Sequence, residues 1–391
     1  MAGGRPSASG SRGQGLAEAS VGRERDTPHP RVSRESWRDL PIAIGLEMKV
    51  LHAPSEIAGQ PSILARALRD LGVEAWSVTT NPTFAQYRPD ESPPLDALSP
   101  LPRYAGYAGL VVKHLLRHDL FHFHFGRTLI PPHNLDLPLY RALGKKIVFH
   151  YHGCDVRNRA YMLRTHDWST CTECMPFCLP RRQAKILREA SRYAHAEIVS
   201  TPDLLESVPR ARQVDVAAWL PDYEPRPHRD TPRLVLHAPT NRLIKGTRYV
   251  EEAFERLRPR FPGVTFRTVE KLPWAELKVL LAECDVLVDQ VFMGWYGMVA
   301  VEAMALARPA LAYIRPEFEP RAAGCPVVRI TKETLEQELA ALLAHAPRRR
   351  ALGEAGRAWV QARHEAHVIG RQLIELYRGI GADVGAAGSP R

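Results

Sequence analysis

Residues Cys284–Tyr313 read CDVLVDQVFMGWYGMVAVEAMALARPALAY and carry the strongest indication of the fold. Asp285–Val291 is short, apolar and rich in β-branched residues, which is typical of a buried strand. A loop with two glycines follows, then a predicted helix over Met298–Leu306 and a second strand over Pro309–Ile314. Strand, glycine loop, helix and strand make a parallel α/β unit. Ligands of such sheets bind beyond the carboxyl ends of the strands, with phosphates at the helix N-terminus.

The same stretch resembles the donor-site signature of family 4 glycosyltransferases, which have the GT-B fold. In that family a glutamate precedes a Gly-Phe-Gly-like triplet, and a second glutamate opens Glu-Ala-Met-Ala. Trp295–Gly297 matches the triplet, and Glu302–Ala305 matches the second glutamate without a gap. Gly294 stands where the family has its first glutamate. The resemblance implies an α/β protein with two Rossmann-like domains that face each other across a cleft.

Length and composition fit a globular protein of several domains. The chain has 391 residues, with 45% hydrophobic and 25% charged side chains. At the usual length of a domain, this corresponds to about two to three domains. No stretch approaches the roughly 20 apolar residues that cross a bilayer, and no secretory segment follows Met1. Six cysteines without regular spacing do not suggest a disulfide framework. We therefore expect a cytoplasmic protein.

The charge balance admits several partners. A net charge of +10 is compatible with binding to nucleic acid, to an anionic membrane face or to phosphorylated small molecules. It is equally compatible with arginines that face solvent and bind no partner. No basic stripe interleaved with aromatic residues occurs in the sequence, so we expect no nucleic-acid partner. Peripheral contact with the inner face of a membrane stays open. The resemblance implies a nucleotide-sugar donor, with an acceptor that is a sugar, a lipid-linked glycan or a small molecule.

Composition shifts divide the chain. Residues 1–40 are rich in Gly, Ser, Arg and Pro without periodicity, which predicts a disordered tail. A Pro-, Arg- and Asp-rich linker at residues 221–232 separates an N-terminal acceptor domain, residues 41–222, from a C-terminal donor domain, residues 229–378. Residues 379–391 are predicted to form a second disordered tail.

Both ends of the folded region also resemble the family. Val50–Pro54 reads as the first strand, Gly59 lies in the loop after it, and Ser62–Leu71 is an amphipathic helix with Ser62 as a plausible N-cap. The resemblance places the Gly59 loop against the acceptor and the donor phosphates. Arg348–Tyr377 is predicted as one long helical tract. In the family the last such helix packs back on the N-terminal domain.

Histidines mark two strands of the N-terminal domain. Leu120–Gly126 alternates strictly, with His122 and His124 on one side and phenylalanines on the other. These histidines are either half-buried and bonded to neighbouring loops or part of a cleft wall. Lys146–Gly153 is the next strand, and His152 near its end matches the histidine that lines the acceptor side in the family. An imidazole with a pKa near 6.5 could accept a hydroxyl proton, so His152 is a candidate catalytic residue.

Four cysteines form a candidate metal site. Cys171, Cys174 and Cys178 are closely spaced, and Cys154 precedes them. The spacing suits tetrahedral binding of a structural Zn²⁺. Free structural thiols and a redox pair are the alternatives. No catalytic metal is expected, because the family does not use one.

The donor site follows from the resemblance. Arg242 and Lys245, predicted in the loop 240–247, match the cations that clamp the diphosphate and assist catalysis, although two solvated loop cations would give the same pattern. Glu302 would hold ribose hydroxyls, and Trp274 lies in the region that presses on the base. The remaining predicted donor-binding residues, through their backbone where the chain comes close, are Gly59, Gly294, Tyr296, Gly297, Met298 and Val299.

The predicted reaction is sugar transfer from a nucleoside-diphosphate sugar with retention of the anomeric configuration. Gly294 removes a carboxylate that normally lies near the donor sugar. Asp289, at the end of the preceding strand, either compensates for this loss or merely caps the strand. Two other functions stay open: a nucleotide-sugar epimerase, and a catalytically inactive protein that binds nucleotide sugars.

Overall fold

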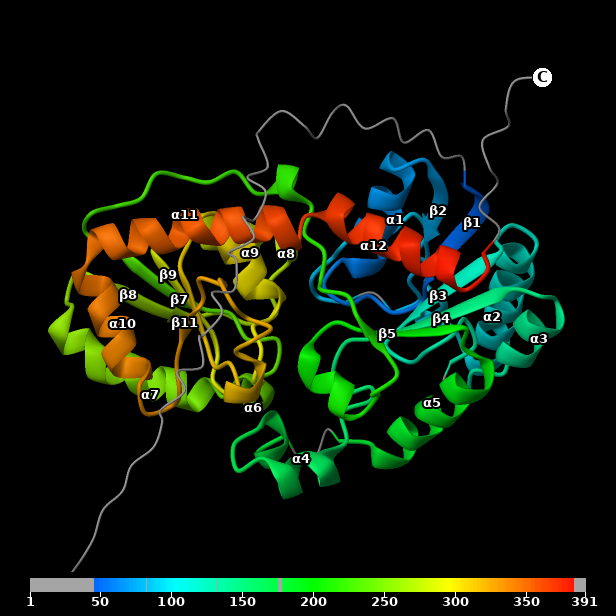
Figure 1. Cartoon of the computed structure of the whole chain (residues 1–391), viewed down its shortest axis with the longest axis horizontal. Coiled ribbons are helices and arrows are strands. Elements are labelled where there is room, and N and C mark those ends of the chain that lie inside the picture. Colours follow the sequence, from blue (N-terminus) through cyan, green and yellow to red (C-terminus); the bar gives the residue numbers. More distant parts are fainter. Residues whose placement is uncertain (1–45, 82, 132, 175–177, 383–391) are drawn as a thin grey trace, which may run out of the picture. The chain divides into compact units, whose positions relative to one another are not determined.

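Two parallel β-sheets, one after the other along the chain, organise the protein (Figure 1). The computed structural model describes residues 46–81, 83–131, 133–174 and 178–382. They belong to one compact unit, residues 42–391. The predicted tail at residues 1–40, and most of the second predicted tail, lie outside the described residues. Within the second, the described residues include Ala382, which is buried.

The N-terminal lobe has a six-stranded sheet in the order β2-β1-β3-β4-β5-β6, with every pair parallel. Its strands are β1 (Leu46–Ala53), β2 (Val73–Ser77), β3 (Leu120–His124), β4 (Lys146–Tyr151), β5 (Ala196–Val199) and β6 (Arg212–Gln213). Its helices are α1 (Gln60–Asp70), α2 (Pro100–Leu115), α3 (Leu137–Ala142), α4 (Arg159–Thr165) and α5 (Pro180–Tyr193).

The C-terminal lobe has a five-stranded parallel sheet in the order β11-β10-β9-β7-β8. Its strands are β7 (Leu234–His237), β8 (Thr265–Thr268), β9 (Val286–Gln290), β10 (Ala310–Ala312) and β11 (Val328–Arg329). The helices after the linker are α6 (Arg242–Lys245), α7 (Thr247–Leu257), α8 (Trp274–Glu283), α9 (Met298–Ala305), α10 (Leu335–Ala344), α11 (Ala346–Arg363) and α12 (Ala366–Gly379). Short 3₁₀ turns are η1 (Leu95–Ala97), η2 (Thr170–Thr172), η3 (Pro202–Glu206), η4 (Leu220–Asp222), η5 (Arg258–Arg260) and η6 (Pro316–Phe318).

The first sheet is buried on both faces, as parallel sheets usually are. Phe121 and Phe123 of β3 point into a core formed with α3 and α5. His122 and His124 lie on the opposite face, which confirms the predicted alternation. Both histidines are completely buried and contact other histidines, so the expectation of half-buried side chains at a loop or cleft wall was wrong. The sequence did not reveal that α1 and α12 cover this face.

The start of α1 differs from the prediction. Gly59, with φ 73°, is the N-cap, and Ser62 lies inside the first turn. The left-handed backbone at Gly59 is one that glycine adopts without a steric penalty. The Glu56 carboxylate holds this turn by accepting a hydrogen bond of 2.6 Å from the Gly59 amide. The helix therefore begins two residues earlier than its amphipathic pattern indicates.

The predicted helical tract at the end of the chain is two helices. The chain breaks between α11 and α12, where Ala218 donates its amide hydrogen to the His364 carbonyl at 2.7 Å and accepts from Ala366 at 3.0 Å. After this break α12 lies along α1 of the N-terminal lobe (Figure 1). A Cβ at Gly370 would lie 2.8 Å from Leu71, so glycine permits the close approach of the two helices. No helix among the described residues is both long and apolar enough for a membrane span.

Candidate active site

The loop between β9 and α9 explains why position 294 is a glycine. Gly294 has φ 75°, and a Cβ there would lie 2.7 Å from Cγ of Arg315. Arg315 is buried and donates to Glu206 of the N-terminal lobe at 2.8 Å. A glutamate at position 294 would strain the backbone and displace Arg315. The departure from the family signature is therefore built into the packing of this loop.

Gln290, the last residue of β9, fixes the shape of the same loop. Its side-chain oxygen accepts hydrogen bonds from the amides of Phe292 at 2.7 Å and Met293 at 2.6 Å. Its side-chain nitrogen donates to the carbonyls of Trp295 at 3.2 Å and Tyr313 at 2.7 Å. One buried amide side chain thus satisfies four backbone groups and holds the entry to α9.

A buried ion pair lies directly under the N-terminus of α9. The ammonium of Lys245 is 2.7 Å from Oδ1 of Asp289, and both side chains are buried. Oδ2 of Asp289 accepts a hydrogen bond of 2.6 Å from the Gly297 amide. A Cβ at Gly297 would lie 2.7 Å from Nζ of Lys245. Asp289 therefore does more than cap its strand, because it joins Lys245 to the turn that opens α9.

Arg242 occupies different surroundings from Lys245. The predicted loop contains the one-turn helix α6, whose first and last residues are these two cations. The Arg242 side chain is exposed and pairs with Glu251 and, at 3.0 Å, with Glu270. The structure therefore brings Lys245 to the α9 N-terminus and leaves Arg242 at the exposed side of α6.

The first turn of α9 offers backbone donors, while the preceding aromatic side chains are buried. Met298 and Val299 open the helix, and the N-cap residue, Gly297, has no side chain to cap their amides. Tyr296 is buried in the core, with its hydroxyl 3.0 Å from Nε2 of His364. Of the predicted residues here, Gly297, Met298 and Val299 thus lie at the helix start, and Tyr296 can contribute only its backbone.

Glu302, in the second turn of α9, is held by two aromatic donors. The Tyr223 hydroxyl donates to its Oε1 at 3.0 Å, and the Trp274 indole donates to the same oxygen at 2.8 Å. Among the described residues nothing donates to Oε2. Burial raises the pKa of Glu302 to about 7, and the two donors oppose this rise. The site therefore contains a carboxyl group that changes charge near neutral pH.

A second buried carboxyl faces this region from the N-terminal lobe. Glu56 bonds the Gly59 amide through Oε1, while its buried Oε2 has no partner among the described residues. Burial raises the pKa of Glu56 to about 7. Gln60, the first residue of α1, reaches Met298 across the lobes, with Nε2 3.9 Å from the sulfur. The N-termini of α1 and α9 are therefore neighbours.

A cavity of about 620 Å³ lies beside this junction. Tyr87 packs over Gly59, and its ring centroid is 5.6 Å from that of Trp274. The Trp274 amide also donates to the carbonyl of Ala85 at 2.9 Å, which joins the two lobes along one wall. The cavity is lined by Gly59, Ser62, Ile63, Arg66, Arg69, Ser77, Ala85, Gln86, Tyr87, Arg88, Asp90, Trp219, Asp222, Pro273, Trp274 and Ala275.

His152 lies where the sequence places it, just after β4, and it is half-buried. Both of its ring nitrogens face protein atoms: Nδ1 is 2.7 Å from the Ser200 hydroxyl, and Nε2 is 2.9 Å from Nδ1 of His124. Burial lowers the pKa of His152 to about 3. The ring is therefore neutral, and accepting a proton from a substrate would require one of these contacts to break.

The four cysteines lie near one another, but no group of three at metal-binding distance forms among them in the described part of the chain. Within the described part of the chain, the groups of three candidate metal ligands that come within 4.8 Å of one another contain no cysteine. Cys171 and Cys174 are buried against Met162. Burial raises the pKa of the Cys171 thiol to about 12, with Arg157 opposing the rise. The described geometry thus gives free thiols, and a zinc site receives no support from it.

Three solved structures share this architecture. Sucrose-phosphate synthase from Thermosynechococcus elongatus matches with a TM-score of 0.60 at 17% identity, over 85% of this chain and 99% of that one. HepE from Anabaena, in complex with UDP and glucose, matches with a TM-score of 0.55 at 14% identity, over 85% and 100%. MnaA from S. aureus, in complex with UDP, matches with a TM-score of 0.51 at 11% identity, over 88% and 100%. No protein-family model and no curated protein matches the sequence.

At these identities the comparisons establish the fold. The GT-B arrangement of two Rossmann-like lobes, predicted from Cys284–Tyr313, is confirmed. Assignment to family 4, and retention of configuration, stay predictions.

Four residues that shape the site were not predicted from the sequence: Glu56, Tyr87, Tyr223 and Gln290. Gln290 could have been predicted, because it is a polar residue at the end of an apolar strand. Tyr223 lies in the stretch that composition marks as a linker, where no local pattern indicates a partner.

Proposed function

We propose that the protein is a glycosyltransferase that moves a sugar from a nucleoside-diphosphate sugar to an acceptor hydroxyl, with retention of configuration. The observation that carries this proposal is the arrangement of Lys245, Asp289 and Gly297 under the open N-terminus of α9, with Glu302 one turn further along. A buried ammonium beside uncapped helix amides is a favourable environment for a phosphate anion.

The diphosphate would bind at the amides of Met298 and Val299. Asp289 uses one of the three N–H donors of Lys245, so two remain for phosphate oxygens. Because this ion pair is neutral as a whole, the helix N-terminus must supply much of the attraction. Gly59 at the N-terminus of α1 would face the donor from the other lobe, consistent with the contact of Gln60 with the α9 start.

The nucleoside would lie on the other side of the helix start. Oε2 of Glu302 is the atom available for ribose hydroxyls, because Tyr223 and Trp274 both use Oε1. Arg242 could join the diphosphate only after leaving Glu251 and Glu270. HepE and MnaA were solved with UDP, which supports uracil as the first base to test.

In the reaction the bond between the anomeric carbon and the diphosphate oxygen breaks, and the diphosphate takes the electron pair. Lys245 and the α9 amides would stabilise the charge that develops on it, which is the main catalytic demand. The anomeric carbon acquires oxocarbenium character, as in glycoside hydrolysis. The acceptor hydroxyl oxygen would form the new bond to the anomeric carbon on the face that the diphosphate leaves, and its proton would pass to the departing diphosphate. His152 would line the acceptor side. A cytoplasmic location is part of the proposal, and the six free cysteines support it.

The test is incubation of the protein with UDP-sugars, with and without a panel of sugar, lipid-linked and small-molecule acceptors. Acceptor-dependent release of UDP is expected, and product analysis by NMR reads the anomeric configuration. Sugar isomerisation without release would instead establish an epimerase, and binding of UDP-sugars without turnover an inactive binding protein. Either result overturns the proposal.

Three variants test which residues bind the donor. Glu302→Gln keeps shape and removes the charge, so UDP binding should weaken about 10-fold or more. Arg242→Gln should reduce transfer only if the exposed guanidinium moves to the donor. Arg350→Gln, which changes an exposed arginine on α11, is the control and should leave transfer unchanged. Equal UDP affinity in Glu302→Gln and the control would exclude this donor site.

A further inference from the structure

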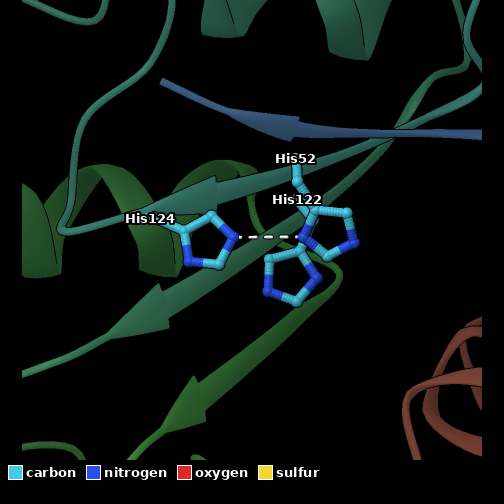
Figure 2. A group of neighbouring side chains, drawn as sticks. All are labelled: His52, His122 and His124. Atoms are coloured by element: carbon cyan, nitrogen blue, oxygen red, sulfur yellow. Dashed lines mark hydrogen bonds between the residues drawn. The ribbon is translucent and has the colours of Figure 1, made fainter. Parts of the chain in front are cut away.

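Five histidines lie together on one face of the N-terminal sheet, which we call the histidine layer: His52 of β1, His122 and His124 of β3, His150 of β4 and His152 just after β4. Strand register places them on the same face, because His52 pairs with His122 and His124 pairs with His150. Figure 2 shows three of the rings side by side across β1 and β3. Four of the five are completely buried, and His152 is half-buried.

The rings contact one another through their nitrogens. The distances are 3.1 Å from His52 Nδ1 to His124 Nε2, 2.9 Å from His124 Nδ1 to His152 Nε2, and 3.2 Å from His122 Nε2 to His150 Nδ1. Groups outside the layer extend the chain of contacts. The Tyr377 hydroxyl of α12 is 2.6 Å from Nδ1 of His122, and the Ser200 hydroxyl lies between His150 and His152.

One ring nitrogen of the histidine layer has no hydrogen-bond partner among the described residues: Nε2 of His52, which is buried. A buried nitrogen without a partner lowers the stability of the folded protein, whichever tautomer the ring adopts. His52, His122 and His124 are completely buried, and burial disfavours the charged form of an imidazole. Neutral imidazole is the form that binds metal ions.

We propose that His52, His122 and His124 bind a divalent first-row transition metal ion through their ring nitrogens. Each offers a nitrogen within 4.8 Å of the other two. A Zn–N bond of 2.0–2.1 Å implies ligand nitrogens about 3.3 Å apart in a tetrahedron. Nδ1 of His52 and Nε2 of His124 are 3.1 Å apart, and they would exchange their shared hydrogen bond for bonds to the ion. The rings of His122 and His124 are stacked 14° from parallel, so one of them must turn to direct its nitrogen at the ion. Three imidazoles with an open fourth position are an established zinc-binding set.

The chemistry of the donors selects the ion. All three ligands are imidazoles, which suit Zn²⁺, Ni²⁺ and Cu²⁺, whereas Mg²⁺, Ca²⁺ and Mn²⁺ prefer carboxylates and carbonyls. A second group, His124 with His150 and His152, shares one ligand with the first. All three rings of the first group are completely buried, whereas the second group includes the half-buried His152, which gives the ion a route inward.

The neighbours of these ligands fit the role of outer-shell partners. The Tyr377 hydroxyl at Nδ1 of His122 would orient that ring, and His152 does the same for His124. Because Tyr377 belongs to α12, the bound ion would connect the last helix to β1 and β3. The ion should therefore stabilise the association of α12 with the N-terminal lobe, independently of any sugar transfer.

The experiment measures metal binding to the untagged full chain in a Cys174→Ser background, which reduces competition from the cysteines. After chelator treatment and dialysis, Zn²⁺ and Ni²⁺ are added separately, and bound metal is counted by mass spectrometry. We expect about one ion per chain and a melting temperature that rises with metal concentration. His124→Phe should lose the ion, whereas His133→Gln, an exposed histidine, should keep it.

Tyr377→Phe is the second variant, because it keeps all three ligands and the buried ring and removes only the hydroxyl next to His122. It should bind Zn²⁺ about 10–100-fold more weakly, as outer-shell changes do. The proposal is overturned if the background protein retains no ion. It is equally overturned if Tyr377→Phe and a folded His124→Phe bind metal as tightly as His133→Gln does.

Discussion

Replacing Glu302 by glutamine should stabilise the protein above pH 7 while weakening its affinity for UDP. In the folded protein burial raises the pKa of Glu302 from 4.5 to about 7. The difference of about 2.5 pH units corresponds to about 3 kcal/mol, at 1.36 kcal/mol per unit. Glutamine has nearly the same shape, can still accept from Tyr223 and Trp274, and carries no charge to desolvate.

The pH window follows from linkage. A carboxyl group with a raised pKa in the folded state holds its proton longer than in the unfolded chain. The stability from that proton is therefore complete below pH 4.5 and is lost as pH rises through about 7. Glu302→Gln should then be more stable than the wild type by about 3 kcal/mol at pH 8, and by about 1 kcal/mol or less at pH 5.

The assay compares melting temperatures and urea midpoints of the two proteins at pH 5 and pH 8. Glu354→Gln, which changes an exposed glutamate of α11, is the control and should show no such pH-dependent gap. UDP titration at pH 8, where Glu302 is ionised, should give a dissociation constant about 10–100-fold higher for Glu302→Gln, because a charge-assisted hydrogen bond is lost. A variant that is less stable than the wild type at pH 8, or a stability difference that does not change with pH, would contradict this explanation.

Three further changes test the surroundings of the α9 N-terminus. Gly294→Glu restores the family residue. It should destabilise the protein by about 1–3 kcal/mol and should not raise the rate of sugar transfer, because the backbone is left-handed at this position and Arg315 occupies the space. A gain in transfer activity without a loss of melting temperature would contradict this prediction. Lys245→Met should lower the free energy of unfolding by about 3–5 kcal/mol, because it leaves Asp289 buried and unpaired. Adding Asp289→Asn should restore stability in urea unfolding but should not restore UDP binding. Recovery of both would show that Lys245 does not contact the donor. Tyr296→Phe removes the hydrogen bond of the hydroxyl to His364 at the α11–α12 junction. It should lower stability in thermal unfolding by about 1 kcal/mol and leave UDP binding unchanged. Weaker UDP binding would show that the Tyr296 side chain, and not its backbone alone, contributes to the donor site.

Local patterns in the sequence were sufficient for the framework of the C-terminal lobe. The apolar run before Gln290 forms β9, and the glycine loop leads directly into α9, as predicted. Strict alternation in β3 correctly separated histidines from phenylalanines. These features depend on neighbours within a few residues, because strand and helix periods are set by the local backbone.

The sequence alone was less informative at helix ends and at apparent loops. Gly59 rather than Ser62 begins α1, and α6 stands where a loop was predicted. The break between α11 and α12 is made by hydrogen bonds to Ala218, which is far away in the sequence. Such boundaries are decided by which backbone groups find tertiary partners, and the helical pattern on both sides of the break gives no sign of them.

Residue patterns were enough to predict the two-lobed α/β fold and to single out Lys245, Gly297 and Glu302 as candidate site residues. The partners of these residues became known only from the folded protein: Asp289 for the ammonium, and Tyr223 and Trp274 for the carboxylate. The same holds for the histidine layer, which three separate segments of chain bring to one face. The physical reason is burial, because the charge and hydrogen bonding of a buried polar group depend on the atoms packed around it. Those atoms come from segments that no local sequence pattern connects.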